Sequence, residues 1–370
     1  PTLNYMGESV QLLLTQRVES RLESVRDAMR RLQYREAIKL ALEIDKEELQ
    51  TVQLSELMDA MWLATSELDN KYKEKIHGYD IIIAIGEKLL KQKNNDPDIL
   101  KRVVRAIINK GITFSYLNCS EKSIILYDDV IYRLNKVTEP TLREWIAKAL
   151  VVKGNTLSRL SRNKEAIAAY DEVIKQFGGT AELSLCVWIA RALISKGYSL
   201  DKLNQCEEAI KTYDEVVTQF GEETDINLRE RVAWALITKG YLLGKLNRYE
   251  EAVTVYDEVV KKFGMNTEPN LRDLVLEALI IKVSMLDILD RNENAIDEKI
   301  KRRLNMIIIL LKLQRFNEAQ HFFKQFTENS VINLQIAKDF LSDLELLTLA
   351  PQPPEGIQQF LEQARKILVK

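Results

Sequence analysis

Residues 194–220 read ISKGYSLDKLNQCEEAIKTYDEVVTQF, and residues 237–263 read ITKGYLLGKLNRYEEAVTVYDEVVKKF. The Lys-Gly pair near the start of each stretch recurs every 43 residues, at Lys110-Gly111, Lys153-Gly154, Lys196-Gly197 and Lys239-Gly240, and then as Lys282-Val283. A tyrosine followed by two acidic residues keeps the same interval, at Tyr127, Tyr170, Tyr213 and Tyr256. Self-similarity at a fixed period of this length predicts a solenoid, in which each unit buries its apolar face against its neighbours.

Each repeat predicts a hairpin of two helices. In the repeat 138–178, apolar residues follow helical spacing from 142 to 160, and a polar break at 161–163 precedes a second helix at 164–177. The start Thr138-Glu139-Pro140 is typical of a helix N-terminus, because Thr caps and Pro fits the first turn. Equivalent starts occur at Asn95-Asp96-Pro97 and Thr267-Glu268-Pro269, and Gly178-Gly179 is typical of a helix end.

The pattern divides the chain into three segments. We expect degenerate helical repeats at 1–94, regular repeats at 95–300, and a degenerate repeat with capping helices at 301–370. The regular repeats are predicted at 95–135, 138–178, 181–221 and 224–264, with a fifth that begins at 267 and loses the pattern after 295. Further helices are predicted at 51–92 (one pair), near 331–348 and at 357–370. The sequence shows no strand-like alternation. It therefore predicts an all-α array of about fifteen or sixteen helices.

The glycines inside the first helices predict a close helix crossing. Each such glycine costs about 1 kcal/mol relative to Ala in a helix, so its recurrence at Gly154, Gly197 and Gly240 needs a packing reason. We expect the second helix to cross closely there, with the tyrosines filling the space beside small partners. The predicted small partners are Ala166, Ala209, Ala252 and Ala295.

The order of these residues resembles the tetratricopeptide repeat (TPR) family. In Gly154, Ala166 and Tyr170, and in their equivalents one and two periods later, Gly is followed by Ala after twelve residues and by an aromatic after four more. The period of 43 instead of the family's 34 indicates a variant with a longer first helix. The resemblance implies a right-handed superhelix, or α-solenoid, whose first helices line a concave groove that binds proteins or peptides.

Composition and motifs argue against several function classes. The net charge of −2 gives no electrostatic reason to expect nucleic acid, although a local basic strip is compatible with it. Three cysteines without CxxC spacing favour a reducing, cytoplasmic location, and no apolar run is long enough to span a membrane. Two distant histidines, His77 and His321, and the absence of a phosphate loop give no catalytic, metal or cofactor site, so we expect no enzyme. The acidic pairs after the tyrosines are expected to form a solvated outer stripe.

Candidate binding residues occupy the variable slots of the first helix. The slot after the glycine holds Asn155, Tyr198 and Tyr241, and the slot six before it holds Arg105, Lys148, Arg191, Trp234 and Glu277. The slot three before it is aliphatic throughout, which disfavours a carboxylate-clamp site. We therefore predict partner contacts from Lys148, Asn155, Arg191, Tyr198, Trp234 and Tyr241, because aromatic and Arg side chains are common binding anchors. Packing of Tyr198 and Tyr241 against the next repeat is the open alternative.

Three functions fit these patterns. The first is a non-catalytic scaffold or regulatory subunit that binds a partner peptide or helix in the groove. The second is a peptide-sensing signalling regulator of the bacterial helical-repeat type. The third is the recognition part of a larger enzyme, such as a protease or a nucleotide-hydrolysing regulator, with its catalytic domain outside this chain. The amphipathic helix at 357–368 is expected either to cap the last repeat or to occupy a groove, and the oligomeric state and pathway stay open.

Overall fold

The computed structural model describes the chain except for residues 1, 93–95, 136–139, 265, 267, 290–295, 313–314, 330–331, 351–352 and 369–370. All regular structure in the described part is helical, and the chain separates into two compact units, residues 1–195 (unit 1) and 196–370 (unit 2). The division falls inside one long helix. The three segments predicted from the regularity of the repeats remain a proposal about the sequence.

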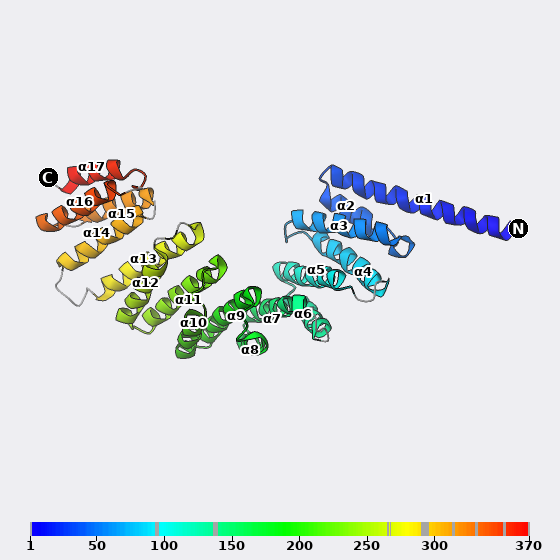
Figure 1. Ribbon diagram of the computed structural model, residues 1–370, viewed down its shortest axis with the longest axis horizontal. Coiled ribbons are helices and arrows are strands. Elements are labelled where there is room, and N and C mark those ends of the chain that lie inside the picture. The colour runs from blue at the N-terminus through cyan, green and yellow to red at the C-terminus, as the bar shows by residue number, and fades with distance from the viewer. Residues whose placement is uncertain are drawn as a thin grey trace. The chain divides into compact units, whose positions relative to one another are not determined.

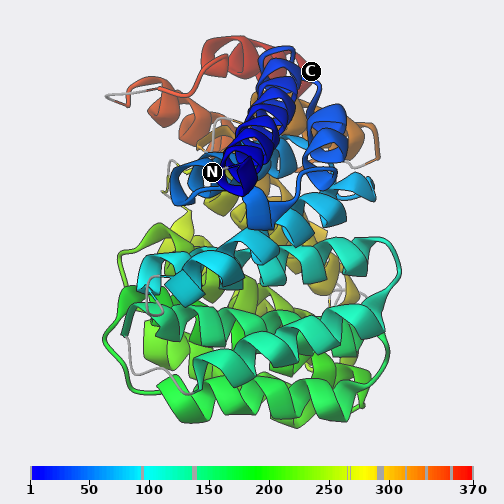
Figure 2. The ribbon, with the colours of Figure 1, turned by 90° about the vertical axis from the view of Figure 1, so that its right-hand side faces the viewer.

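Unit 1 contains eight α-helices and most of a ninth among its described residues (Figure 1). Figure 2 shows several of these helices lying alongside one another as a stack. Each of α4 to α7 packs directly against the next helix in the sequence. The helices are α1 (Thr2–Arg30), α2 (Tyr34–Leu42), α3 (Thr51–Glu67), α4 (Glu74–Gln92), α5 (Pro97–Tyr116), α6 (Ser120–Leu134), α7 (Arg143–Arg159), α8 (Asn163–Phe177) and α9 (Leu183–Lys202), with short 3₁₀ helices at Lys46–Glu48 and Pro140–Leu142.

Unit 2 continues the same order of long and shorter helices. They are α10 (Cys206–Phe220), α11 (Ile226–Lys245), α12 (Tyr249–Phe263), α13 (Pro269–Leu289), α14 (Ile296–Lys312), α15 (Phe316–Asn329), α16 (Leu334–Thr348) and α17 (Ile357–Leu368). The predicted hairpins are confirmed, and the described residues contain 17 α-helices, slightly more than expected. Consecutive first helices also touch each other, because α5 packs against α7 and α11 against α13.

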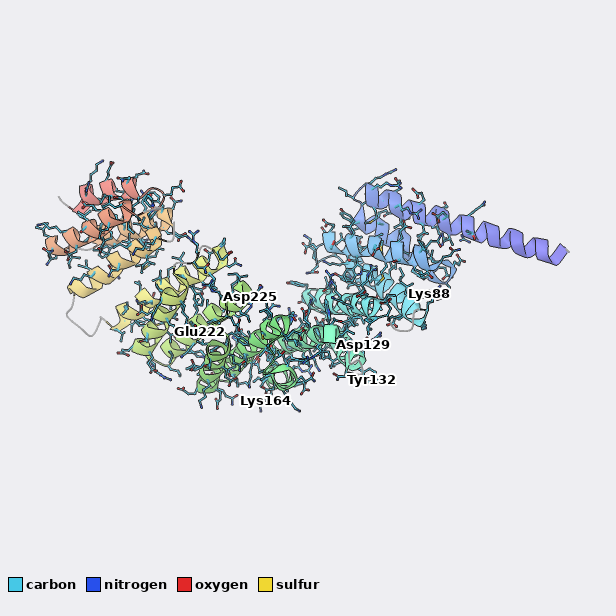
Figure 3. The ribbon with its side chains drawn as sticks, viewed as in Figure 1. Lys88, Asp129, Tyr132, Lys164, Glu222 and Asp225 are labelled. Carbon is cyan, nitrogen blue, oxygen red and sulfur yellow. The ribbon has the colours of Figure 1, made fainter. Side chains whose placement is uncertain are left out.

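The helices α5 and α13 begin at the predicted prolines, Pro97 and Pro269, whereas the predicted capping positions Asn95 and Thr267 lie outside the described residues. Asp96 caps α5 by accepting hydrogen bonds from the amides of Asp98 (2.9 Å) and Ile99 (3.4 Å). Asp225, labelled in Figure 3, caps α11 in the same way. In the second repeat, however, α7 begins only at Arg143, after the 3₁₀ turn that starts at Pro140, and Thr138 lies outside the described residues.

The same left-handed turn joins the two helices of each hairpin. Asn118, Ser161, Asn204 and Asn247 all have φ between 58° and 61°. Asn tolerates this conformation better than most residues, because its short polar side chain can bond locally. Leu32 adopts it as well, with φ of 58°, at a position that stands five periods of 43 residues before Asn247. The N-terminal flank therefore contains the same hairpin turn despite its weak sequence pattern.

The recurring glycine accommodates the recurring tyrosine. A Cβ atom on Gly154 would lie 2.4 Å from the ring of Tyr170, and a Cβ atom on Gly240 would lie 2.6 Å from the ring of Tyr256. The first and third repeats of the regular set show the same contact. The alanines expected as the small partners are buried where described, but the atoms nearest to the missing Cβ belong to the tyrosines. Ala295 lies outside the described residues. Glycine is thus required at this position because the tyrosine ring occupies the space that a Cβ atom would fill.

Ion pairs between repeats use the residues that flank this contact. Lys153, next to Gly154, lies 2.6 Å from Asp128 of the preceding repeat, and Lys239 lies 2.5 Å from Asp214. Lys282 pairs with Asp257 in the same way. The first acidic residue of each pair is thus about half exposed, as expected of an outer stripe, and it also forms an ion pair with the next repeat. Because the pairs are partly exposed, each contributes only about 0–1 kcal/mol.

The C-terminal helices form their own apolar cluster. Phe360 of α17 is fully buried, and its ring centroid lies 5.3 Å from that of Phe323 on α15. Phe323 also stacks on Phe340 of α16 at 5.9 Å. The last helix therefore covers the apolar faces of α15 and α16, which agrees with the capping alternative.

Gly240→Ala tests the glycine–tyrosine contact. Helix propensity alone predicts a gain of about 1 kcal/mol from this change. We expect instead a loss of about 1–3 kcal/mol, because the new methyl group overlaps the ring of Tyr256. The urea midpoint, followed by circular dichroism, should fall; a rise would show that the ring can move away without cost.

Candidate functional site

The variable slots lie on one face of each first helix. The slot six before the glycine and the slot one after it are seven residues apart, which is two helical turns. Trp234 and Tyr241 occupy these slots on α11, and Lys148 and Asn155 occupy them on α7. We call the surface that carries these slots the first-helix face of each unit.

In unit 2 this face carries large aromatic side chains that remain accessible. Tyr198 is 50% exposed, Trp234 is 43% exposed and Tyr241 is 55% exposed. About half of Tyr198 and of Tyr241 is therefore accessible, and packing of the covered half against the next repeat stays the open alternative. The ammonium of Lys202 lies 5.0 Å from the ring centroid of Tyr198. We call Tyr198, Trp234 and Tyr241 the aromatic row.

The slot after the glycine has a different role in unit 1. Asn155 accepts a hydrogen bond of 2.8 Å from the hydroxyl of the buried Tyr170. In unit 2, tyrosines replace this Asn, and the buried hydroxyls of Tyr213 and Tyr256 have no hydrogen-bond partner. Burial is the main cause that raises the pKa of both phenols. Asn155 is therefore a partner of the interior tyrosine, whereas Tyr198 and Tyr241 are not.

Cations of unit 1 lie over tryptophan rings. The Nζ atom of Lys148 is 4.8 Å from the ring centroid of Trp145, and the Cζ atom of Arg191 is 4.7 Å from that of Trp188. Trp188 is buried and donates to Glu144 at 3.4 Å, as suits a packing residue. The predicted contact residues Lys148 and Arg191 are thus only partly exposed, and each lies over a tryptophan ring.

Two contributors to this surface were missed by the sequence-based list. Arg105 lies over Trp62, with 4.8 Å between its Cζ atom and the ring centroid. The sequence places Arg105 in the same slot, 43 residues before Lys148, but the predicted contacts did not include it. Trp62 could have been found as well, because it stands on α3 in the same slot, 43 residues before Arg105.

A cavity of ≈ 500 Å³ opens in unit 2 between α13, α14 and α15. It lies where the glycine–tyrosine contact is lost, because Val283 takes the glycine position and the sequence has Lys299 in the tyrosine position. Arg303 is the charged residue among those that line it. The lining residues are Ile280, Val283, Ser284, Arg303, Met306, Ile307, Phe322, Gln325 and Phe326. Ser284 occupies on α13 the slot that Tyr241 occupies on α11, so the cavity borders the first-helix face.

The described part of the chain offers no metal cluster. No group of three or more His, Cys, Asp or Glu side chains in it is placed to hold an ion. Its three cysteines are free thiols. Among the same residues, no helix is both long enough and apolar enough to cross a membrane.

Comparison with known families supports the resemblance of these repeats to the tetratricopeptide repeat. The tetratricopeptide repeat family model matches residues 147–176 and 235–261, which contain the Gly, Ala and Tyr slots of two repeats. These two segments of the chain match tetratricopeptide repeats. The chain's period of 43 residues exceeds the 34 of the standard unit. No curated protein matches the sequence significantly.

Several solved structures show a weak likeness to this chain. BtubC (BKLC) from P. vanneervenii is 14% identical, with 72% of this chain and 95% of that one covered and a TM-score of 0.42. The apo form of RapI is 16% identical, with coverage of 95% and 86% and a TM-score of 0.44. A Rap protein complexed with competence and sporulation factor is 14% identical, with coverage of 89% and 99% and a TM-score of 0.39. At these identities the likeness concerns the fold alone.

Phe substitutions distinguish the partnered and unpartnered interior tyrosines of these repeats. Tyr170→Phe removes a hydrogen bond to Asn155 and should lower the free energy of unfolding by about 1 kcal/mol. Tyr213→Phe removes a buried hydroxyl without a partner, so stability should stay the same or rise. Both variants keep the ring against its glycine. Equal losses in urea unfolding would contradict this assignment of the slot after the glycine.

Proposed function

We propose that this chain is a non-catalytic protein-interaction module that binds a peptide or helix of a partner on the first-helix face of unit 2. The observation that supports this proposal is the exposure of the aromatic row. Three large aromatic side chains stay about half exposed there, while the tyrosines of the second helices, such as Tyr213 and Tyr256, are completely buried. Exposed Trp and Tyr side chains are frequent hot spots of protein interfaces.

The geometry favours a segment that crosses several first helices. Trp234 and Tyr241 are two turns apart on α11, and Tyr198 comes from α9. On α13 the equivalent slots hold Glu277 and Ser284, both exposed, which supply a polar continuation of the face. A partner with apolar side chains in the middle and polar groups at the rim matches this distribution.

The cavity beside Ser284 supplies a place for one apolar anchor. Its volume of ≈ 500 Å³ lies within the range of about 300–1,000 Å³ typical of ligand pockets. Met306, Ile307 and Phe326 make its wall apolar, and Arg303 places a positive charge among them. An apolar side chain that is followed by an acidic group would fit both features.

Substitution of the aromatic row tests the proposed function. A tagged chain is used to recover its partner from an extract of the native host, and affinity is then measured with the purified partner. The variant Tyr198→Ala/Trp234→Ala/Tyr241→Ala should bind at least about thirtyfold more weakly, because the loss of hot-spot residues costs about 2 kcal/mol or more.

The matched control is Tyr132→Ala. Tyr132 is 63% exposed but belongs to the second helix α6, where Figure 3 labels it. This variant should retain the wild-type affinity. Equal affinity of the triple variant and the wild type, or equal loss in the control, would remove the aromatic row as the binding surface.

A further inference from the structure

The first helix α11 carries aromatic residues in both variable slots. Trp234 and Tyr241 stand six before and one after the glycine, whereas the other regular repeats carry a charged residue in the first of these slots. Both rings are about half exposed. Packing of the repeat does not require them, because the same hairpin forms with a charged residue in place of Trp234. We call Trp234 and Tyr241 the α11 pair.

A short side chain separates the two rings of the α11 pair. Thr238 lies four residues after Trp234 and three before Tyr241, on the same face of the helix. Its hydroxyl donates to the backbone carbonyl of Trp234 at 2.8 Å, so it turns back toward its own helix. The two outer positions are two helical turns, or about 10.5 Å, apart along the axis. A small apolar group of a ligand therefore has room between the rings.

Each residue of the α11 pair also carries a hydrogen-bond donor that the chain does not use. Within the part of the chain that the structure describes, neither the indole N–H of Trp234 nor the hydroxyl of Tyr241 forms a hydrogen bond. A partner helix has few backbone acceptors to offer, because its carbonyls are bonded internally. A polyproline II segment has no internal hydrogen bonds, so its carbonyls remain available. The unused donors therefore favour an extended, proline-rich ligand.

The spacing of the α11 pair suits such a ligand. In a polyproline II segment, residues three apart project from the same side and are separated by about 9 Å. That distance is close to the two-turn separation of Trp234 and Tyr241. Spacing by itself would also suit a helix, whose seventh residue lies equally far along its axis, so the unused donors decide between the two. The fixed φ of proline also reduces the entropy lost on binding.

The neighbouring first helix adds a negative charge. Glu277 takes on α13 the slot that Trp234 takes on α11, and the two helices pack against each other. Its carboxylate is exposed and forms no ion pair with any described residue. Burial is the main cause that raises the pKa of Tyr256, and the charges of Glu277 and Tyr241 raise it further, so both lie near that hydroxyl. A basic side chain beside the prolines would complement Glu277.

We propose that the α11 pair binds a proline-rich segment in the polyproline II conformation that is flanked by Lys or Arg. This inference rests on the proposed function and names the chemistry of the partner segment. Prolines three residues apart pack on the two rings, and backbone carbonyls of the segment accept hydrogen bonds from Trp234 and Tyr241. The basic side chain reaches across to Glu277 on α13.

Fluorescence anisotropy with short labelled peptides tests the inference. The proline peptide consists of one arginine followed by six prolines, with both ends blocked, and the comparison peptide has alanines in place of the prolines. We expect the proline peptide to bind at least about tenfold more tightly, because its backbone is already ordered in the bound conformation. Equal affinity for the two peptides would overturn the inference.

Conservative variants separate the rings from their donors. Trp234→Phe and Tyr241→Phe each keep an aromatic ring and remove one donor, so each should weaken binding of the proline peptide about fivefold. Trp234→Ala/Tyr241→Ala removes both rings and should abolish measurable binding. Wild-type affinity of both Phe variants would contradict the hydrogen bonds that select an extended ligand over a helix.

A matched pair of leucine variants tests the space between the rings. Thr238→Leu fills that space and should weaken binding about tenfold, since one additional methylene in a binding pocket has an effect of that size. The control is Thr254→Leu on the second helix α12, where the hydroxyl also donates to the carbonyl four residues earlier, at 2.9 Å. The control should bind normally with a wild-type helical spectrum. Equal loss in both variants would overturn the inference.

Glu277→Gln tests the basic flank. This variant should bind the proline peptide about threefold more weakly, because the new ion pair is exposed to solvent. A proline peptide with glutamine in place of the arginine should bind the variant and the wild type equally. Unchanged affinity for the arginine-containing peptide would remove the basic flank from the proposal.

A helical competitor distinguishes this inference from the proposed function. The competitor is an amphipathic helical peptide with leucines seven residues apart. If it binds the α11 pair and the proline peptide does not, the inference fails while the proposed function stands. If Tyr198→Ala/Trp234→Ala/Tyr241→Ala retains wild-type affinity for the purified native partner, both fail.

Discussion

The contact between a tyrosine ring and a glycine of the preceding helix is the constraint on which this array depends. The ring of Tyr170, Tyr213 or Tyr256 occupies the space where any Cβ atom on the facing glycine would lie. Gly is a poor helix former, with a cost of about 1 kcal/mol relative to Ala. The chain accepts that cost in repeat after repeat, because the ring sets the distance at which the second helix crosses the first. The cavity in unit 2 lies where this contact is missing.

This constraint separates packing positions from recognition positions. Once the ring, the glycine and the buried alanine fix the hairpin, the slots six before and one after the glycine are free to vary. Unit 1 fills the first of these slots with cations over tryptophan, and unit 2 carries exposed aromatic residues in the same face. The two units therefore present different chemistry at equivalent positions of the repeat.

The sequence predicts the hairpins well because the period, the caps and the polar breaks are all local signals. It also places Trp234 and Tyr241 on one face of α11, and Lys148 and Asn155 on one face of α7, since helical spacing alone determines that. The sequence did not show that the tyrosine ring occupies the space where a Cβ atom of the glycine would lie. Spacing alone cannot tell whether Ala166 or Tyr170 lies closer to Gly154. The pairing of Asp128 with Lys153 was missed for a related reason: contacts between repeats depend on how the hairpins stack. Trp62 stands 43 residues before Arg105, so the period identifies its slot, whereas only the folded chain shows that Arg105 lies over its ring.

A double-mutant cycle between Gly197 and Tyr213 tests the central contact most directly. Gly197→Ala, Tyr213→Leu and the double variant are compared with the wild type in urea unfolding. We expect the alanine to be much less harmful once the ring is gone, with a coupling energy of about 1 kcal/mol or more between the two sites. Effects that add within about 0.5 kcal/mol would contradict the view that the ring and the glycine form one packing unit.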